Sequence, residues 1–336
     1  ETNAALCLDM ESYAYKDITI EVFRRLRAWL PDYDHLGLVL QAYLRDTESD
    51  LRRLLAWMRK RELPSAIRLV KGAYWDYETV VAAQNGWANR VWDRKPQTDA
   101  NFEKCARLLL ESTDICYFAC GSHNIRSIAA VLENADQLGV SDDRFEFQVL
   151  YGMAEPVRDA ILRETGRVRL YAPFGELIPG MAYLVRRILE NTANESFLRA
   201  TFGDKVDVDA LLESPAKKLG NAPPPETAAP NGFTNAPTTD FTQATQAEAM
   251  REAIAAIRDN HLGQFRPLWI GGRELEGGEN RTQTSVNPNR TNEVLGEFAI
   301  ATMEQAQLAT LEAKRSFSSW AAKSPNERAN SLRKAA

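Results

Sequence analysis

The stretch IRLVKGAY, residues 67–74, decides the fold, because it joins a short apolar strand to a glycine and polar side chains. Five further runs of this kind occur: ALCLD (5–9), LGLVLQAY (36–43), ICYFACGSHN (115–124), FEFQVLYG (145–152) and VRLYAPFG (168–175). Amphipathic helical stretches lie between the runs, as in residues 50–62, 101–112 and 127–139. Such alternation predicts an α/β fold in which parallel strands are joined by crossover helices.

Polar side chains at the strand ends choose between the parallel architectures. These residues are Asp9, Glu11, Gln41, Tyr43, Arg68, Lys71, Tyr74, His123, Asn124, Gln148 and Tyr171. Taken singly, they have structural explanations: Asp9 and Asn124 could cap the following segments, His123 could be a satisfied loop histidine, and the glutamines could satisfy buried backbone. Taken together, they indicate a (β/α)8 barrel, whose active site lies at the carboxyl ends of its strands. No G-x-G-x-x-G motif follows any strand, which disfavours a Rossmann unit.

Only six of the eight βα units of such a barrel are recognisable. We expect the other two upstream of Glu1, because the chain lacks an initiator methionine and opens almost directly on a strand. It also stops within a helical pattern, NSLRKAA, so the sequence is interpreted as an interior piece of a longer protein.

A helix is predicted over GMAYLVRRILENTAN, residues 180–194, with strictly segregated faces. Residues three and four apart share a helix face. One face therefore carries Tyr183, Arg186, Arg187, Glu190 and Asn194, and the other carries Leu184, Val185, Ile188 and Leu189. The polar face is either a solvated ion-paired stripe or a clamp in which two guanidiniums bind a carboxylate.

The composition narrows the function classes. Of 336 residues, 44% are hydrophobic and 26% charged, as expected for globular domains. A net charge of −5 without a basic run makes nucleic acid an unexpected partner. No apolar run is long enough to span a membrane. Three histidines disfavour a histidine-rich metal site, and the four cysteines are expected to be reduced thiols of a cytosolic protein.

Several motifs in order resemble the proline dehydrogenase family, in the form found in the bifunctional flavoenzyme proline utilization A. They are RLVKGAYW (68–75), DRKPQTD (93–99), SHN (122–124), FEFQVLYGM (145–153), RLYAPFG (169–175) and YLVRRILEN (183–191). The resemblance covers roughly residues 5 to 200. It implies a distorted (β/α)8 barrel that binds FAD and oxidises L-proline to Δ1-pyrroline-5-carboxylate. The electrons would pass to membrane quinone, so we expect a cytoplasmic, peripherally membrane-associated protein that could be a homo-oligomer.

The resemblance also assigns roles to individual residues. The catalytic set would be Arg68, Tyr171, Arg186, Arg187 and Glu190, with Arg186 and Arg187 holding the proline carboxylate, Glu190 orienting them, and Arg68 near flavin N5. The substrate pocket would contain Asp9, Ala73, Tyr74, Leu150, Tyr171, Tyr183, Arg186 and Arg187. The FAD contacts would be Gln41, Arg68, Val70, Gly72, Trp75, Lys95, His123, Asn124, Gln148 and Glu190. Ser122 and Asp93 depart from the family pattern, and the family's substrate-site lysine is expected on an early strand that precedes this chain.

The remainder of the chain has a different composition. Residues 203–246 are rich in proline, threonine, alanine and asparagine toward their C-terminal end, and we interpret them as a linker that follows the barrel at 1–202. Residues 247–336 resemble the start of an aldehyde dehydrogenase, through IGG (270–272), VNPNRTNEVLGEFAIAT (286–302) and FSSWAAKSPNER (317–328). The resemblance implies an NAD-dependent glutamate-semialdehyde dehydrogenase in the longer protein, with its catalytic residues beyond Ala336.

Two other functions are consistent with some of these patterns. Lys71 ends a strand, as the lysine of a Schiff-base lyase does. If Arg68 and Val70 face the barrel interior, however, strand alternation makes Lys71 point away from it. The second alternative is a non-enzymatic scaffold whose charged helix binds a partner, and bound flavin would exclude it.

Overall fold

A computed structural model describes residues 4–176, 178, 180–181, 183–185, 187, 209, 212–219, 235–278 and 281–335. The chain divides into two compact units, residues 1–242 and 243–336. Arg186 and Glu190 lie outside the described residues.

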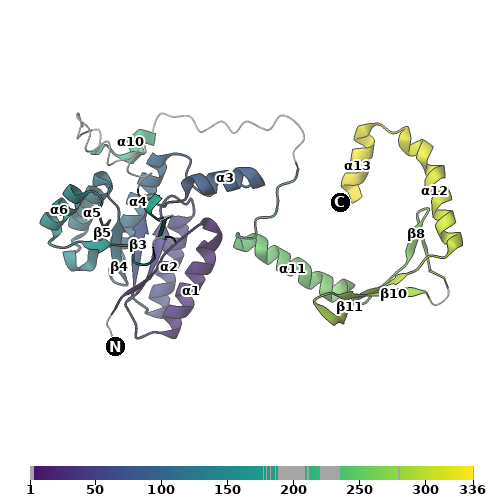
Figure 1. The fold of residues 1–336 in the computed structure, drawn as a ribbon, viewed down its shortest axis with the longest axis horizontal. Helices are drawn as coiled ribbons and strands as arrows, with labels where there is room; N and C mark the ends of the chain where they lie inside the picture. Colours follow the sequence, from purple (N-terminus) through teal and green to yellow (C-terminus); the bar gives the residue numbers. More distant parts are fainter. Residues whose placement is uncertain are drawn as a thin grey trace. The chain divides into compact units, whose positions relative to one another are not determined.

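The first unit contains a parallel six-stranded sheet in the order β1-β2-β3-β4-β5-β6 (Figure 1). The strands are β1 (Leu6–Leu8), β2 (Leu36–Gln41), β3 (Ser65–Val70), β4 (Cys116–Gly121), β5 (Phe145–Leu150) and β6 (Arg169–Tyr171). The main helices are α1 (Lys16–Trp29), α2 (Thr47–Arg61), α3 (Trp75–Asn85), α4 (Lys95–Leu110), α5 (Ile125–Leu138) and α6 (Glu155–Thr165). The six predicted strands and their parallel order, that of consecutive barrel strands, are therefore confirmed.

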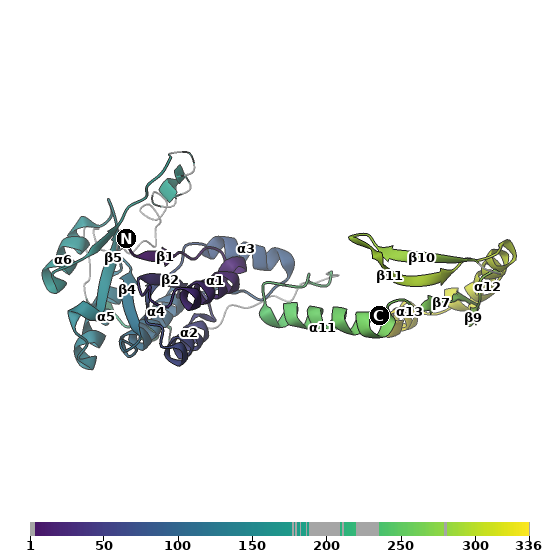
Figure 2. The same ribbon diagram turned by 90° about the horizontal axis from the view of Figure 1, so that it is seen from below.

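Alternation along the strands separates two faces of the sheet. On β3, Ser65, Ile67 and Leu69 are buried, whereas Arg68 and Val70 are only half-buried. Ile67 and Leu69 join a hydrophobic core that includes side chains from α2, α4 and α5, and these helices lie along one side of the sheet (Figure 2). The opposite face, which would be the barrel interior, therefore carries Arg68 and the polar side chains of the neighbouring strands.

A buried ion cluster lies at the start of α1. The Lys16 ammonium is 2.7 Å from Asp50, 2.6 Å from Asp17 and 3.2 Å from Asp46. Burial alone would lower the pKa of Lys16, but Asp46 and Asp50 outweigh it and the pKa is raised. We call Lys16, Asp17, Asp46 and Asp50 the α1 ion cluster.

Part of the predicted linker packs on the remainder of the first unit. Helix α10 (Pro215–Leu219) contacts α4. Farther along, Asp240 is buried and forms a 2.8 Å ion pair with Arg90, and the Trp87 indole donates to the Thr238 carbonyl at 2.6 Å. The groups that bind Thr238 and Asp240 are Trp87 and Arg90, so linker composition could not reveal them.

The second unit, described on its own, begins with α11 (Ala244–His261). Its strands are β7 (Phe265–Arg266), β8 (Leu268–Ile270), β9 (Arg273–Leu275), β10 (Thr282–Asn287) and β11 (Arg290–Ala299), of which β10 and β11 form an antiparallel hairpin. Helices α12 (Met303–Ala321) and α13 (Pro325–Ala335) follow. Thr302 caps α12 by accepting from the Gln305 N–H, while the Gln305 side chain accepts from the Thr302 N–H. None of the described helices is long and apolar enough to cross a bilayer.

Candidate active site

Arg68 is the centre of the polar face of the sheet. Its Nη1 donates to Gln148 Oε1 at 3.3 Å, and its Nη2 lies 3.3 Å from Asp9 Oδ1. The guanidinium lies 5.7 Å from the centroid of the Tyr171 ring. Four predicted site residues, from β3, β5, β6 and the end of β1, are thus brought together.

An aromatic and cationic row continues from Tyr171. The Tyr171 and Tyr183 rings lie 6.2 Å apart, tilted by 36°, and the Arg187 guanidinium lies 5.1 Å from the Tyr183 ring. Residues 183–185 and 187 are helical, as predicted for this segment. A wall of two aromatic rings with a guanidinium beside it therefore adjoins Arg68, and such a guanidinium can bind a carboxylate.

His123 is held in one protonation state beside this row. Its Nε2 accepts from the Leu150 backbone N–H at 3.0 Å, which leaves the ring proton on Nδ1. Burial, and secondarily the positive charge of Arg187, lower the pKa of His123 to about 4. A neutral imidazole is therefore expected at physiological pH.

The remaining predicted FAD contacts are distributed around the strand ends. Gln41 is buried, and its Nε2 donates to the Met10 carbonyl at 3.3 Å. Asn124 caps α5 by accepting from the Ser127 N–H at 3.1 Å, the structural role that the sequence left open. Trp75 donates to the Trp92 carbonyl at 2.7 Å, and Lys95 is the exposed first residue of α4.

Two predicted pocket residues have different surroundings from Arg68. Tyr74 packs on a cluster formed by Tyr43, Leu44 and Val91. Ala73 is exposed in the loop that follows β3. Their assignment to the substrate pocket stays a prediction.

Gly72 allows the chain to turn after β3. Its φ is +120°, and a Cβ at this position would lie 2.3 Å from the Tyr43 ring. Both the backbone conformation and the close approach require glycine. Gly121 serves a related purpose, because a Cβ there would lie 2.9 Å from the Val70 side chain.

Lys71 lies on the helix side of β3. Its ammonium forms a hydrogen-bonded ion pair with Asp99 on α4 and lies 5.7 Å from the Phe102 ring. Burial lowers the pKa of Lys71 in spite of Asp99. The alternation argument against a lysine nucleophile in the barrel interior agrees with this placement.

Sequence reasoning did not find Glu146 and Arg169. Glu146 accepts from Gln148 Nε2 at 2.6 Å, from Arg169 Nε and Nη2 at 2.6 and 2.8 Å, and from the Tyr117 hydroxyl at 3.2 Å. A signal was present, because Glu146 and Arg169 each precede a predicted site residue by two positions on the same strand. We call Asp9, Arg68, Gln148, Glu146 and Arg169 the strand-end network.

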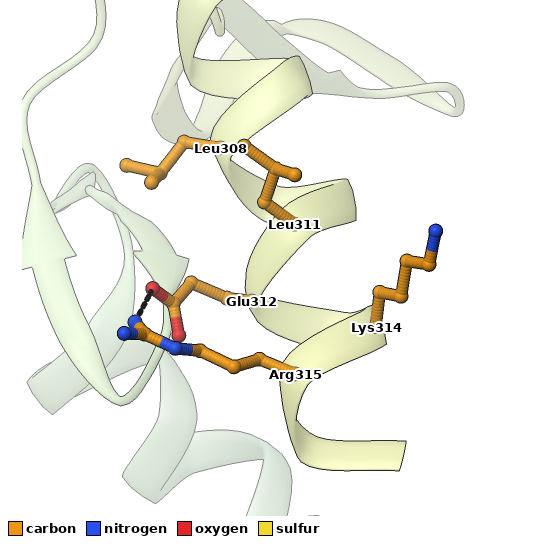
Figure 3. A pocket seen from close by; sticks show the side chains of 5 residues that line it. All are labelled: Leu308, Leu311, Glu312, Lys314 and Arg315. Carbon is orange, nitrogen blue, oxygen red and sulfur yellow. Dashed lines mark hydrogen bonds and ion pairs between the residues drawn. The ribbon is translucent and has the colours of Figure 1, made fainter. Parts of the chain in front are cut away.

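A separate hollow lies along α12 in the second unit. Figure 3 shows its lining residues, Leu308, Leu311, Glu312, Lys314 and Arg315, with Glu312 accepting from Arg315 at 3.1 Å. None of them is a predicted site residue. Among the described residues, no group of three or more His, Cys, Asp or Glu side chains could hold a metal ion.

Residues 1–200 match the family model for proline dehydrogenase. The chain belongs to the proline dehydrogenase family. Residues 275–336 match the model of the aldehyde dehydrogenase family, so the predicted order of the two domains is found.

Relatives match either nearly the whole chain or about half of it. A crystal structure of proline utilization A from Bdellovibrio bacteriovorus, inactivated by N-propargylglycine, is 41% identical with a TM-score of 0.86, and covers 97% of this chain and 34% of its own. The bifunctional protein PutA of Klebsiella aerogenes is 29% identical over 98% of this chain and 26% of its own length. Proline dehydrogenase 2 of Bacillus subtilis is 33% identical over 56% of this chain and 55% of its own. The chain thus spans about a quarter of the length of its curated bifunctional relatives.

Proposed function

We propose that the first unit forms part of a site that oxidises L-proline to Δ1-pyrroline-5-carboxylate with FAD, and that the electrons pass to quinone. The observation that carries the proposal is the meeting of Arg68, Gln148, Asp9 and Tyr171 at the strand ends, with Tyr183 and Arg187 alongside. Membership of the proline dehydrogenase family supports the reaction class.

The residues at the strand ends fit a flavin. Gln41 Oε1 is buried and has no hydrogen-bond partner among the described residues, as expected of an acceptor that a bound molecule would satisfy. Together with Arg68, His123, Gln148 and Lys95, Gln41 would hold the cofactor. When bound, FAD accepts the two electrons that leave proline as hydride from C5, while the amine nitrogen gives up a proton.

The chain's own residues mainly orient the substrate. Arg187, together with Arg186 outside the described residues, would fix the carboxylate bidentately, and the Tyr171 and Tyr183 rings would fix the plane of the pyrrolidine. The Arg68 guanidinium places a positive charge where electron density increases during the reaction. Asp9, near Arg68, would complete the polar rim of the pocket.

The longer protein would then oxidise glutamate semialdehyde with NAD, since the second unit matches the start of an aldehyde dehydrogenase. The Schiff-base lyase receives no support from the geometry, because the amine of Lys71 lies against Asp99 and Phe102.

The test uses the intact protein that contains this chain, purified without oxygen. L-proline should bleach its visible flavin band, whereas D-proline should not. N-propargylglycine, which inactivates the Bdellovibrio protein, should abolish the bleaching. Arg186→Met should raise the KM for proline by about two orders of magnitude, as expected for loss of a charge-assisted bidentate contact. A well-folded protein without flavin, or an unchanged KM, would overturn the proposal.

A further inference from the structure

Glu146 has four hydrogen-bond donors around it, although it would not itself touch the substrate. It is 8% exposed on the interior face of the sheet. Burial alone would raise the pKa of the Glu146 carboxyl, but the hydrogen bonds from Arg169 and Gln148 outweigh it and the pKa lies below its usual range. Glu146 is therefore a permanent negative charge within the strand-end network.

The Gln148 amide lies between this carboxylate and the Arg68 guanidinium. Its Nε2 donates to Glu146 at 2.6 Å, while its Oε1 accepts from Arg68 at 3.3 Å. The reversed amide would place its NH2 against the donors of Arg68 and its oxygen against the carboxylate, which makes two repulsive contacts. Glu146 thus sets the orientation in which Gln148 can hold Arg68.

The sheet register also makes Glu146 a competing partner for Arg68. Arg68 pairs with Ala119 on β4, and Ala119 pairs with Glu146 on β5, so the three residues form one row. Two strand spacings amount to about 10 Å between the Cα atoms of Arg68 and Glu146, which two long side chains can bridge past alanine. Both carboxylate oxygens, however, are occupied by Arg169.

We propose that Arg169 and Glu146 are positioning residues: Arg169 keeps Glu146 from capturing Arg68, and Glu146, so occupied, orients Gln148 to hold Arg68 at the strand ends. The inference rests on the proposed function, because it concerns the residue that faces the reacting atoms. Arg169 is suited to this because its planar fork engages both oxygens, while its own side chain remains 62% exposed.

Rescue by a second substitution tests the proposal in the intact protein. In Arg169→Gln, Glu146 is free to draw Arg68 away, and flavin reduction at saturating L-proline should slow about tenfold, as misplacement of a reacting group does. The KM should change less than about threefold, because the predicted carboxylate clamp is untouched. Glu146→Gln alone should cost about threefold, since a glutamine oxygen can still accept from Gln148. The double variant should resemble Glu146→Gln and so be faster than Arg169→Gln.

The matched control is Asp114→Asn, which removes a two-bond arginine–carboxylate pair with Arg59 on exposed side chains. It should leave the rate unchanged. Circular dichroism checks folding, and if Arg169→Gln does not fold, Arg169→Lys carries the test with a loss of about threefold that Glu146→Gln relieves.

Two results would overturn the inference: wild-type rates in Arg169→Gln, or a double variant as slow as the product of the single losses. Absence of bleaching by L-proline in the unsubstituted protein would instead overturn the proposed function, so the two failures are distinguishable.

Discussion

The α1 ion cluster and the strand-end network are both polar clusters of the first unit, but they differ in how deeply their members are buried. In the α1 ion cluster, Lys16 and Asp50 are almost wholly buried and lie 2.7 Å apart. In the strand-end network, the outer members Asp9 and Arg169 are mostly exposed, and Arg68 contacts its neighbours at 3.3 Å. A short, buried ion pair such as Lys16–Asp50 indicates a role in stability, whereas the longer contacts of Arg68 leave its guanidinium available to a ligand.

The largest expected effect concerns the contribution of the α1 ion cluster to stability. Lys16→Met should lower the free energy of unfolding by about 3 kcal/mol, because the buried Asp50 then loses its buried cation and keeps only Arg53, whose side chain is mostly exposed. Urea denaturation followed by circular dichroism measures the change. The matched control is Lys104→Met, whose exposed pair with Glu48 should be worth less than about 1 kcal/mol. Equal losses of stability in the two variants would mean that burial of the Lys16 ion pair adds nothing to its contribution to stability.

A substitution of Arg68 in the strand-end network should change the rate of flavin reduction and hardly change the free energy of unfolding. Arg68→Met should slow flavin reduction about a hundredfold, as loss of a charge at the reacting centre does, with unfolding changed by less than about 1 kcal/mol. Stopped-flow absorbance with L-proline measures the rate. Arg45→Met is the control, because Arg45 stacks on Trp92 at 5.1 Å and pairs with Asp93. A large stability loss with an unchanged rate would place Arg68 among structural residues.

Stability should depend on pH through His123. Its pKa is lowered to about 4, from an ordinary value of 6.5, so between these values the unfolded chain binds a proton that the folded chain does not. Stability should therefore increase with pH across this window, by at most about 1.4 kcal/mol per pH unit from this group. His123→Gln should flatten the profile measured by urea denaturation at pH 4 to 7. A profile of unchanged slope in His123→Gln would contradict this origin of the pH dependence.

The smallest expected effect tests whether Lys71, on the helix side of the sheet, is separate from the site that contains Arg68. Lys71→Met should lower stability by about 1–2 kcal/mol, because Asp99 loses a half-buried partner. Oxidation of proline should stay within about twofold of the unsubstituted rate, since the side chain lies on the helix side. Anaerobic proline titration gives the rate. Loss of activity together with borohydride trapping of substrate would support the lyase instead.

Periodicity was enough to predict the six strands, because short apolar runs such as LGLVLQAY alternate along the chain with longer amphipathic helical stretches. Strand ends also predicted the meeting of Asp9, Arg68, Gln148 and Tyr171. The pairing of Glu146 with Arg169 could not be predicted, since it depends on the register between β5 and β6. Arg90 and Asp240 are 150 residues apart, and no local pattern relates them. Sequence patterns can thus indicate which polar side chains lie at one end of the sheet, but not which individual partners they choose.

The conformation and surroundings of Gly72 limit which substitutions this position can accept. At this position a side chain would meet the Tyr43 ring, and the φ of +120° is one that residues with a Cβ rarely adopt. Every single-nucleotide missense change of a glycine codon introduces a Cβ, so no one-step mutation can replace Gly72 conservatively. Gly166, with φ of +70° and open space around it, can accept asparagine. In a saturation library Gly166 should therefore accept asparagine, whereas Gly72 should accept no side chain even where Tyr43 has become smaller, because its φ stays unfavourable for any residue with a Cβ.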